Sequence, residues 1–189
     1  MELTPMATTA SFRLIVILLS GFGLGGCAAV AIEGGQAAKS EVIISQNIKA
    51  AESGDAKAQF SVGEAYCCSL NEGSGLFNTR TSVEWLCKAA RQNYAPAMFK
   101  LGKIYSGDTI DGIRLARRAA AGVVGTSTNF PVAAAWLRLA DMNGERAAGE
   151  RLADVWKDMS AADRTAAQRL FATGVSNQCL WNEVITSSR

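Results

Sequence analysis

The chain has 189 residues, of which 49% are hydrophobic and 7% aromatic, and its formal net charge is +2. This length suits one domain and a targeting segment, and the small charge argues against nucleic acid as a partner. Histidine is absent, which excludes Ser-His-Asp catalysis and zinc sites with histidine ligands. We therefore expect neither a cofactor nor a bound metal.

Alanine supplies much of the hydrophobic content, and only three prolines occur. Alanine costs least in a helix and allows helices to approach closely, whereas proline interrupts helices. The composition therefore predicts an all-α fold. We expect residues 46–175 to form the folded domain and residues 176–189 to form a C-terminal tail.

The first 26 residues have the pattern of a bacterial export signal. Arg13 precedes an apolar run over residues 14–24, which is too short and too rich in glycine at its end to span a bilayer comfortably. The segment ends at Cys27, which is preceded by one leucine and two glycines. This resembles the lipobox, whose cysteine receives lipid and becomes the mature N-terminus. Residues 1–26 are therefore predicted to be a lipoprotein signal peptide, with ordinary cleavage and an uncleaved anchor as alternatives.

Ala28 follows the predicted lipidation site, Cys27. By resemblance to the lipoprotein sorting pattern, it implies an anchor in the outer membrane, with the protein facing the periplasm. Residues 27–45 contain Gly34 and Gly35 and are expected to form a flexible tether and the start of the first helix. The membrane contact that we predict is through the N-terminal lipid.

Residues 46–175 contain an internal repeat, which appears when the sequence is shifted by 39 residues or by 51 residues. Periods of this size are typical of stacked helix pairs, and the difference between the shifts indicates an insertion at about residues 107–129. The recurring positions are small or aromatic, and we expect them to define the packing between helices. They are Ala58, Gly63, Tyr66, Trp85, Ala89, Ala90, Ala97, Gly102, Tyr105 and Trp136.

Each unit is predicted to be a pair of helices. Val62 and Tyr66 lie at helical spacing from Ala58 in the first helix. A glycine inside a helix costs about 1 kcal/mol relative to alanine. The recurring Gly63 and Gly102 therefore indicate positions where a neighbouring helix comes close.

The ends of the predicted helices carry recognisable residues. Gly54, Asn93 and Gly144 stand at equivalent positions, and glycine and asparagine tolerate the left-handed conformation found after helix C-termini. Ser160, followed three residues later by Asp163, is a helix-start signal. The helix that follows is expected to cap the array, because a last repeat cannot cover its own apolar face.

The residues from Ala50 to Tyr66 follow the pattern Ala-x-x-x-Gly-Asp-Ala-x-Ala-Gln-x-x-x-Gly-x-x-Tyr, and Trp-Leu-Cys-Lys-Ala-Ala follows at residues 85–90. This pattern resembles the Sel1-like repeat, a relative of the tetratricopeptide repeat, over about residues 46–158. The resemblance implies a short α/α solenoid of helix pairs with a C-terminal capping helix. It also implies an adaptor role in membrane-associated assemblies.

The cysteines other than Cys27 are Cys67, Cys68, Cys87 and Cys179, and in an exported protein they are expected to form disulfides. We favour a bridge from the Cys67/Cys68 pair to Cys87, with Cys179 bonded to the remaining neighbour. A direct Cys67–Cys68 bond is disfavoured by its torsional requirement. A zinc site and a redox pair are the alternatives, although neither a C-x-x-C motif nor a histidine is present.

No pattern in the sequence indicates catalysis, and we expect no enzymatic activity. No serine stands in an S-x-x-K motif with its partner motifs, and no carboxylates are spaced for paired acid and base work. We expect Trp85, Trp136 and Trp156 to lie in the core, with a ligand groove as the alternative. The predicted function is an envelope-anchored scaffold that mediates protein–protein interaction with an unknown partner.

Two other functions stay open. Some cysteine-rich, exported Sel1-like proteins are associated with β-lactam and cell-wall compounds. That resemblance implies a cell-wall-associated hydrolase or a β-lactam- or peptidoglycan-binding protein as the alternative. The other possibility is a structural envelope lipoprotein that touches peptidoglycan through the insertion at about residues 107–129.

Overall fold

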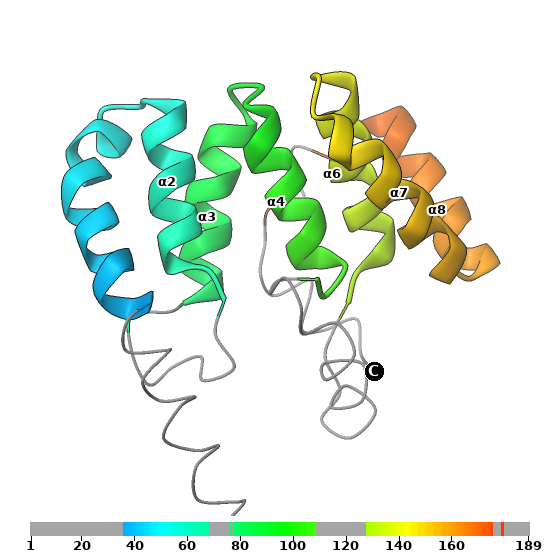
Figure 1. The fold of residues 1–189 in the computed structure, drawn as a ribbon. Helices are drawn as coiled ribbons and strands as arrows, with labels where there is room; N and C mark the ends of the chain where they lie inside the picture. Colours follow the sequence, from blue (N-terminus) through cyan, green and yellow to red (C-terminus); the bar gives the residue numbers. More distant parts are fainter. Residues whose placement is uncertain (1–35, 69–75, 77, 109–127, 176–178, 180–189) are drawn as a thin grey trace, which may run out of the picture. The chain divides into compact units, whose positions relative to one another are not determined.

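The computed structural model describes residues 36–68, 76, 78–108, 128–175 and 179. The predicted signal peptide, most of the tether, most of the insertion and the tail apart from Cys179 lie outside the described residues. The chain divides into two compact units, residues 1–39 and residues 40–189. The helices below belong to the second unit (Figure 1).

The described part of the second unit is helical, and no strand occurs in it, which confirms the predicted all-α class. Residues 40–52 are helical. The labelled helices that follow are α2 (Ala56–Tyr66), α3 (Thr79–Ala90), α4 (Ala95–Tyr105), α6 (Phe130–Met142), α7 (Arg146–Asp158) and α8 (Ala161–Thr173). Within these described ranges, no helix is long and apolar enough to cross a membrane.

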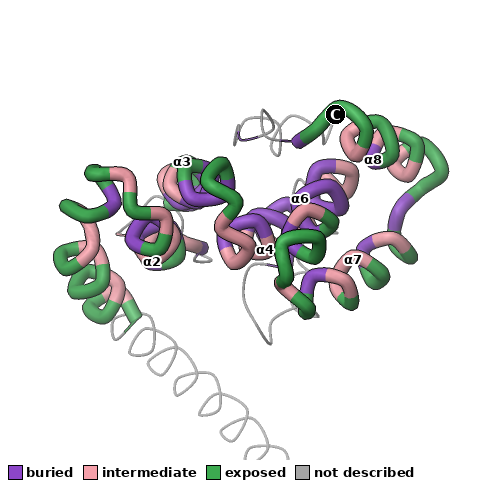
Figure 2. Tube along the Cα trace, turned by 90° about the horizontal axis from the view of Figure 1, so that it is seen from above, coloured by how far each residue is buried: buried purple, intermediate pink, exposed green. Residues whose placement is uncertain are grey.

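The helices pack mostly on their neighbours in the chain, and α6 also packs on a helix further along. α2 packs on α3, α3 on α4, α4 on α6, and α6 on both α7 and α8. Figure 2 shows α2, α4 and α7 in one row and α3, α6 and α8 in a second row behind it. We call α2, α4 and α7, which lie in the same row, the first helices.

The core lies where the two rows meet. Leu86 of α3, Leu101 and Tyr105 of α4, and Trp136 and Leu137 of α6 are almost completely inaccessible to solvent. Trp136 therefore has the core position expected of it, whereas Trp85 and Trp156 are half-buried beside the core. Fully burying one large apolar side chain stabilises a fold by about 1.5–3 kcal/mol, so this group holds α3, α4 and α6 together.

The helix ends have the predicted conformations. Gly54, Asn93 and Gly144 all have positive φ, at 100°, 62° and 93°. This left-handed conformation is favourable for glycine and tolerable for asparagine, and it turns the chain out of one helix toward the next. Ser160 and Asp163 form the expected capping box at the start of α8, which satisfies backbone N–H groups that have no partner inside the helix.

The glycines inside α2 and α4 lie at close helix crossings, as the sequence predicts. A Cβ atom on Gly63 would lie 2.8 Å from Cγ of Leu86 in α3. A Cβ atom on Gly102 would lie 2.5 Å from Cγ of Leu137 in α6. Both separations are shorter than real side chains show, so only a residue without a side chain fits at either position.

The disulfides join Cys67 to Cys68 and Cys87 to Cys179. The favoured bridge from the Cys67/Cys68 pair to Cys87 is therefore wrong. The N–H of Asn78 donates to the carbonyl oxygen of Tyr66 at 2.9 Å, so the end of α2 lies beside the start of α3.

Cys87 lies about 12 Å further along α3 at the helical rise of 1.5 Å per residue. Disulfides join Cα atoms less than about 7 Å apart, so the Cys67/Cys68 pair does not reach it. The direct Cys67–Cys68 bond, which the sequence disfavours, forms where the chain has left the helix. Cys68 has φ of 81° there, and the two side chains are no longer held apart at helical spacing.

Candidate functional site

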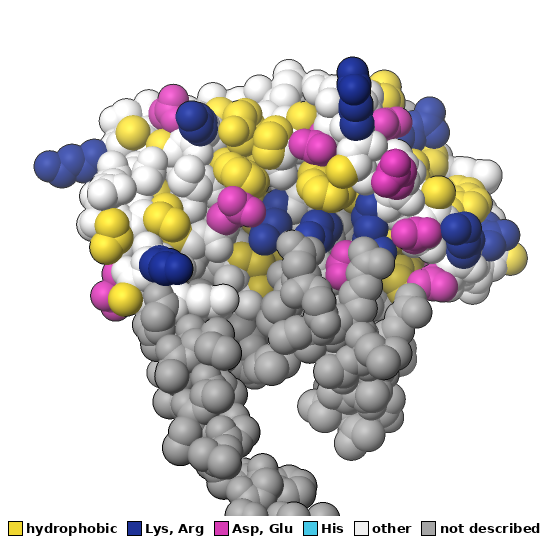
Figure 3. Space-filling model, viewed as in Figure 1, with side chains coloured by type: hydrophobic (Ala, Val, Ile, Leu, Met, Phe, Trp, Pro, Cys, Tyr) yellow, Lys and Arg dark blue, Asp and Glu magenta, His cyan; other side chains and the backbone are white. Residues whose placement is uncertain are grey.

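The first helices are connected to one another by ion pairs across one side of the unit. Nζ of Lys100 in α4 lies 3.4 Å from Oε1 of Glu64 in α2. Nη2 of Arg151 in α7 lies 3.1 Å from Oδ2 of Asp108, which follows α4. We call the surface formed by α2, α4 with Asp108, and α7 the first-helix face. Figure 3 shows basic and acidic side chains interleaved over α4 and α7.

A pocket opens on the first-helix face between α4 and α7, with a cavity volume of about 170 Å³. Sites for drug-sized ligands usually measure about 300–1,000 Å³. This pocket is therefore of a size for one side chain or one chain end, and it is small for a whole substrate molecule. Its lining residues are Phe99, Lys103, Asp108, Ala147, Glu150, Arg151 and Asp154.

Charges of both signs line the pocket, and two of them form a largely buried ion pair. The side chain of Asp108 is 3% exposed and that of its partner Arg151 is 15% exposed. Breaking such a buried pair by removing one partner typically costs about 3–5 kcal/mol, because the other charge stays buried without compensation. Asp108 and Arg151 therefore form a preorganised wall.

The rim of the pocket is more accessible. Glu150 is exposed, and Asp154 accepts a hydrogen bond from Nζ of Lys157 at 3.2 Å. Nζ of Lys103 lies 5.8 Å from the ring centroid of Phe99 on the same wall. A polar or charged group of a ligand would thus meet carboxylates, an ammonium group and an aromatic ring here.

The lining supplies no nucleophile of the hydroxyl or thiol kind among the described residues. The described part of the chain also holds no group of three or more carboxylate or cysteine side chains arranged for a metal ion. The sulfur atoms of Cys67, Cys68, Cys87 and Cys179 are all in disulfides.

The residues that recur in the sequence lie elsewhere, between helices. Ala58, Ala89, Ala90, Ala97, Tyr105 and Trp136 are buried. Gly63 and Gly102 are at the close crossings. Tyr66 and Trp85 are half-buried next to Ala51, Ala58 and Val62. None of these residues lines the pocket, and no tryptophan does. They contribute to the packing that positions the face.

Sequence reasoning missed the pocket residues. On α7, Ala147, Glu150, Arg151 and Asp154 follow one another at helical spacing, which is the available signal. A charged stripe of this kind is ordinary on an exposed helix, so the stripe alone does not distinguish a pocket wall from a solvated surface. The stripe becomes a pocket wall because α7 packs beside the end of α4.

The fold and the pocket define a class: an all-α domain with a small charged pocket between α4 and α7. No protein-family model matches the chain. A comparison with curated proteins gives no significant match either. The predicted lipidation site, Cys27, lies outside the described residues.

Proposed function

We propose that this chain is a helical-repeat scaffold of the Sel1-like type, with its helix pairs forming a short solenoid. In this proposal the protein is anchored by lipid at Cys27 to the outer membrane, and it binds a partner protein in the periplasm. The first-helix face is the binding surface, and the α4–α7 pocket receives one side chain or chain end of the partner.

Equivalent contacts in successive helix pairs support the repeat. The N–H of Asn78 donates to the carbonyl oxygen of Tyr66 at 2.9 Å, and the N–H of Asn129 donates to that of Tyr105 at 2.8 Å. The side chains of Asn78 and Asn129 also cap α3 and α6 in the same way. Tandem copies of one hairpin unit produce contacts that recur in this manner, and stacked copies present an extended surface.

The observation that carries the binding role is the pocket. Its small volume favours an anchoring group of a larger partner over a free small-molecule substrate. Binding energy at protein interfaces is concentrated in a few groups that insert into such preformed depressions. The buried Asp108–Arg151 pair keeps the wall ordered before the partner arrives, which reduces the entropy lost on binding.

The disulfides support the predicted compartment. Disulfides such as Cys87–Cys179 persist in oxidising compartments and are rare in the cytosol of most organisms. This agrees with export, which the apolar N-terminal segment and its lipobox-like end at Cys27 predict.

Site-specific photo-crosslinking in intact cells tests the binding role. A photoreactive amino acid replaces Glu150 at the rim of the pocket or, as the matched control, Glu84, which is exposed on α3 in the other row. We expect a discrete crosslinked species from position 150 and none from position 84. With the photoreactive amino acid at position 150, Lys103→Glu should reduce the yield of the crosslinked species by roughly fivefold or more. The same charge change at the exposed Lys49 should leave that yield unchanged.

Equal crosslinking from positions 84 and 150 would contradict the proposal, and so would a yield that Lys103→Glu leaves unchanged.

Two assays on the purified domain test the alternative functions. Hydrolysis of nitrocefin or of a muropeptide would favour the enzyme. Retention on purified sacculi without any protein partner would favour the peptidoglycan-binding protein.

The anchor is tested separately by Cys27→Ser. Each buried methylene of an acyl chain contributes about 0.8 kcal/mol to membrane affinity, and several chains together give firm anchoring. We expect the native chain to enter the detergent-rich phase of a Triton X-114 partition. The variant should acquire no lipid and should stay in the aqueous phase. A variant that still carries lipid by mass spectrometry would show that Cys27 is not the acceptor.

A further inference from the structure

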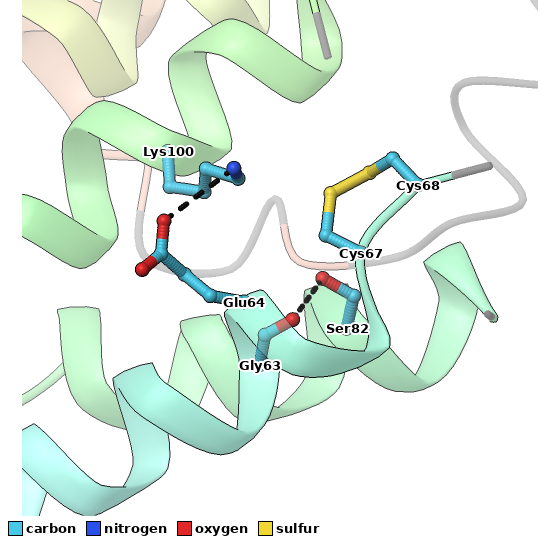
Figure 4. The surroundings of a disulfide bond; sticks show 6 residues. All are labelled: Gly63, Glu64, Cys67, Cys68, Ser82 and Lys100. Atoms are coloured by element: carbon cyan, nitrogen blue, oxygen red, sulfur yellow. Dashed lines mark hydrogen bonds and ion pairs between the residues drawn. A yellow bond between two sulfur atoms is a disulfide. The ribbon is translucent and has the colours of Figure 1, made fainter. Parts of the chain in front are cut away.

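Cys67 and Cys68 are joined by a disulfide directly after α2 (Figure 4). A disulfide stabilises a fold mainly through the loop that it closes, and this one closes none because its cysteines are adjacent. The Cys87–Cys179 bond, by contrast, spans 92 positions of the sequence. The Cys67–Cys68 bond therefore contributes little to the stability of the whole fold, and it acts mainly on the local backbone.

That backbone has an unusual conformation. Cys68 has φ of 81°, a left-handed value that residues with a side chain seldom adopt. The other described residue of this kind is Asn93, and asparagine tolerates the conformation better. The disulfide encloses the peptide bond between Cys67 and Cys68 in a small ring. Opening the ring releases Cys68 to return to negative φ.

The neighbouring contacts connect this ring to two other helices. The N–H of Cys67 donates to the carbonyl oxygen of Glu64, and the side chain of Glu64 pairs with Lys100 of α4 on the first-helix face (Figure 4). The preceding carbonyl, that of Tyr66, accepts the hydrogen bond from Asn78 at the start of α3. A change of backbone at Cys68 therefore acts on the hydrogen bond that holds the start of α3 and on the end of α2.

We propose that Cys67–Cys68 is a reversible thiol–disulfide switch that exchanges with a dithiol protein of the thioredoxin type. This goes beyond the proposed binding role and does not depend on it. Cys68 is 8% exposed and Cys67 is more accessible, so a thiolate of the dithiol attacks Sγ of Cys67. The Cys67–Cys68 bond breaks, a mixed disulfide forms at Cys67, and the Cys68 thiolate takes up a proton.

The second thiol of the partner then gives up its proton, and the resulting thiolate attacks the partner's other sulfur, which is bonded to Cys67 in the mixed disulfide. Cys67 leaves as a thiolate and is protonated. The protein gains two electrons and two protons, and the dithiol becomes a disulfide. In the oxidised protein the ring restrains Cys68 at positive φ, and in the reduced protein the end of α2 relaxes.

Titration of the intact protein with dithiothreitol, followed by maleimide labelling and mass spectrometry, tests the exchange. We expect Cys67 and Cys68 to be labelled at concentrations of dithiothreitol that leave Cys87–Cys179 intact. Amide hydrogen exchange tests the conformational change. The Asn78 amide should exchange about tenfold faster after reduction. This factor corresponds to the free-energy cost of holding one residue, Cys68, in the left-handed conformation. Oxidised dithiothreitol should restore the slow rate.

The Asn129 amide is the internal control, because it makes the same hydrogen bond to Tyr105 in a hairpin without cysteines and its rate should not change. Cys67→Ser with Cys68→Ser should exchange quickly at Asn78 with or without dithiothreitol. The switch is refuted if Cys87–Cys179 opens first, or if exchange at Asn78 is the same in the oxidised and reduced native chain.

Discussion

Replacing both Cys87 and Cys179 by alanine is expected to lower the free energy of unfolding by about 4 kcal/mol. The bond between them spans 92 positions, and the chain-entropy model gives about 4.7 kcal/mol for a loop of roughly 100 residues. Measured losses for native disulfides are typically about 2–5 kcal/mol. Urea unfolding followed by circular dichroism at 222 nm measures the change.

The bond also holds the C-terminal segment against the core. Val175 is 1% exposed and Cys179 is 9% exposed, and both belong to the buried cluster that includes α3, α4 and α6. In the alanine variant this segment should become accessible to protease in the native state. Cys67→Ser with Cys68→Ser is the matched control, because that pair closes no loop, and its stability should change by less than about 1 kcal/mol. Equal losses in the two double variants would contradict the argument.

Gly102→Ala is expected to destabilise the protein by about 2 kcal/mol, although alanine is the better helix former. The helix propensity alone favours alanine by about 1 kcal/mol. The added Cβ, however, would lie 2.5 Å from Cγ and 2.7 Å from Cδ2 of Leu137, and 3.3 Å from the backbone oxygen of Ala133. Overpacking of this kind costs about 1–3 kcal/mol or more, and the backbone of α6 leaves no easy direction of escape.

Two comparisons separate this crowding from a general effect of the substitution. Gly149→Ala in α7 is the matched control, since the nearest atom to its Cβ is the carboxylate end of Asp141, which is free to turn away. That variant should be as stable as the native chain or slightly more so. Leu137→Ala should relieve part of the cost of Gly102→Ala, with a coupling energy of at least about 1 kcal/mol. Strictly additive effects in urea unfolding would rule out the contact.

Several features of this protein were predictable because they depend on one residue and its near neighbours. Gly54, Asn93 and Gly144 have the left-handed conformation that their side chains allow. Gly63 and Gly102 mark close crossings, because a glycine inside a helix is unfavourable without a packing reason.

The cysteine pairing was predicted incorrectly, and the reason is geometric. The direction of each helix and the length of α3 place the end of α2 far from Cys87, while the folding back of the C-terminal segment brings Cys179 to it. Sequence separation says little about such a contact. Cys87 and Cys179 are 92 positions apart, but they come together because α8 packs back against α6. The adjacent pair Cys67–Cys68 needed a local conformation, φ of 81° at Cys68, that no residue type in the pattern signals.

The sequence by itself determined the helical class, the ends of the helices and the small residues at which they cross, because helix propensity, capping and glycine geometry are local properties. Only the tertiary structure decided the partner of each cysteine and the pocket between α4 and α7. These depend on which charged faces come to lie side by side. Lys103 and Arg151 belong to different helices, α4 and α7, and they share a pocket because α6 packs against both of these helices.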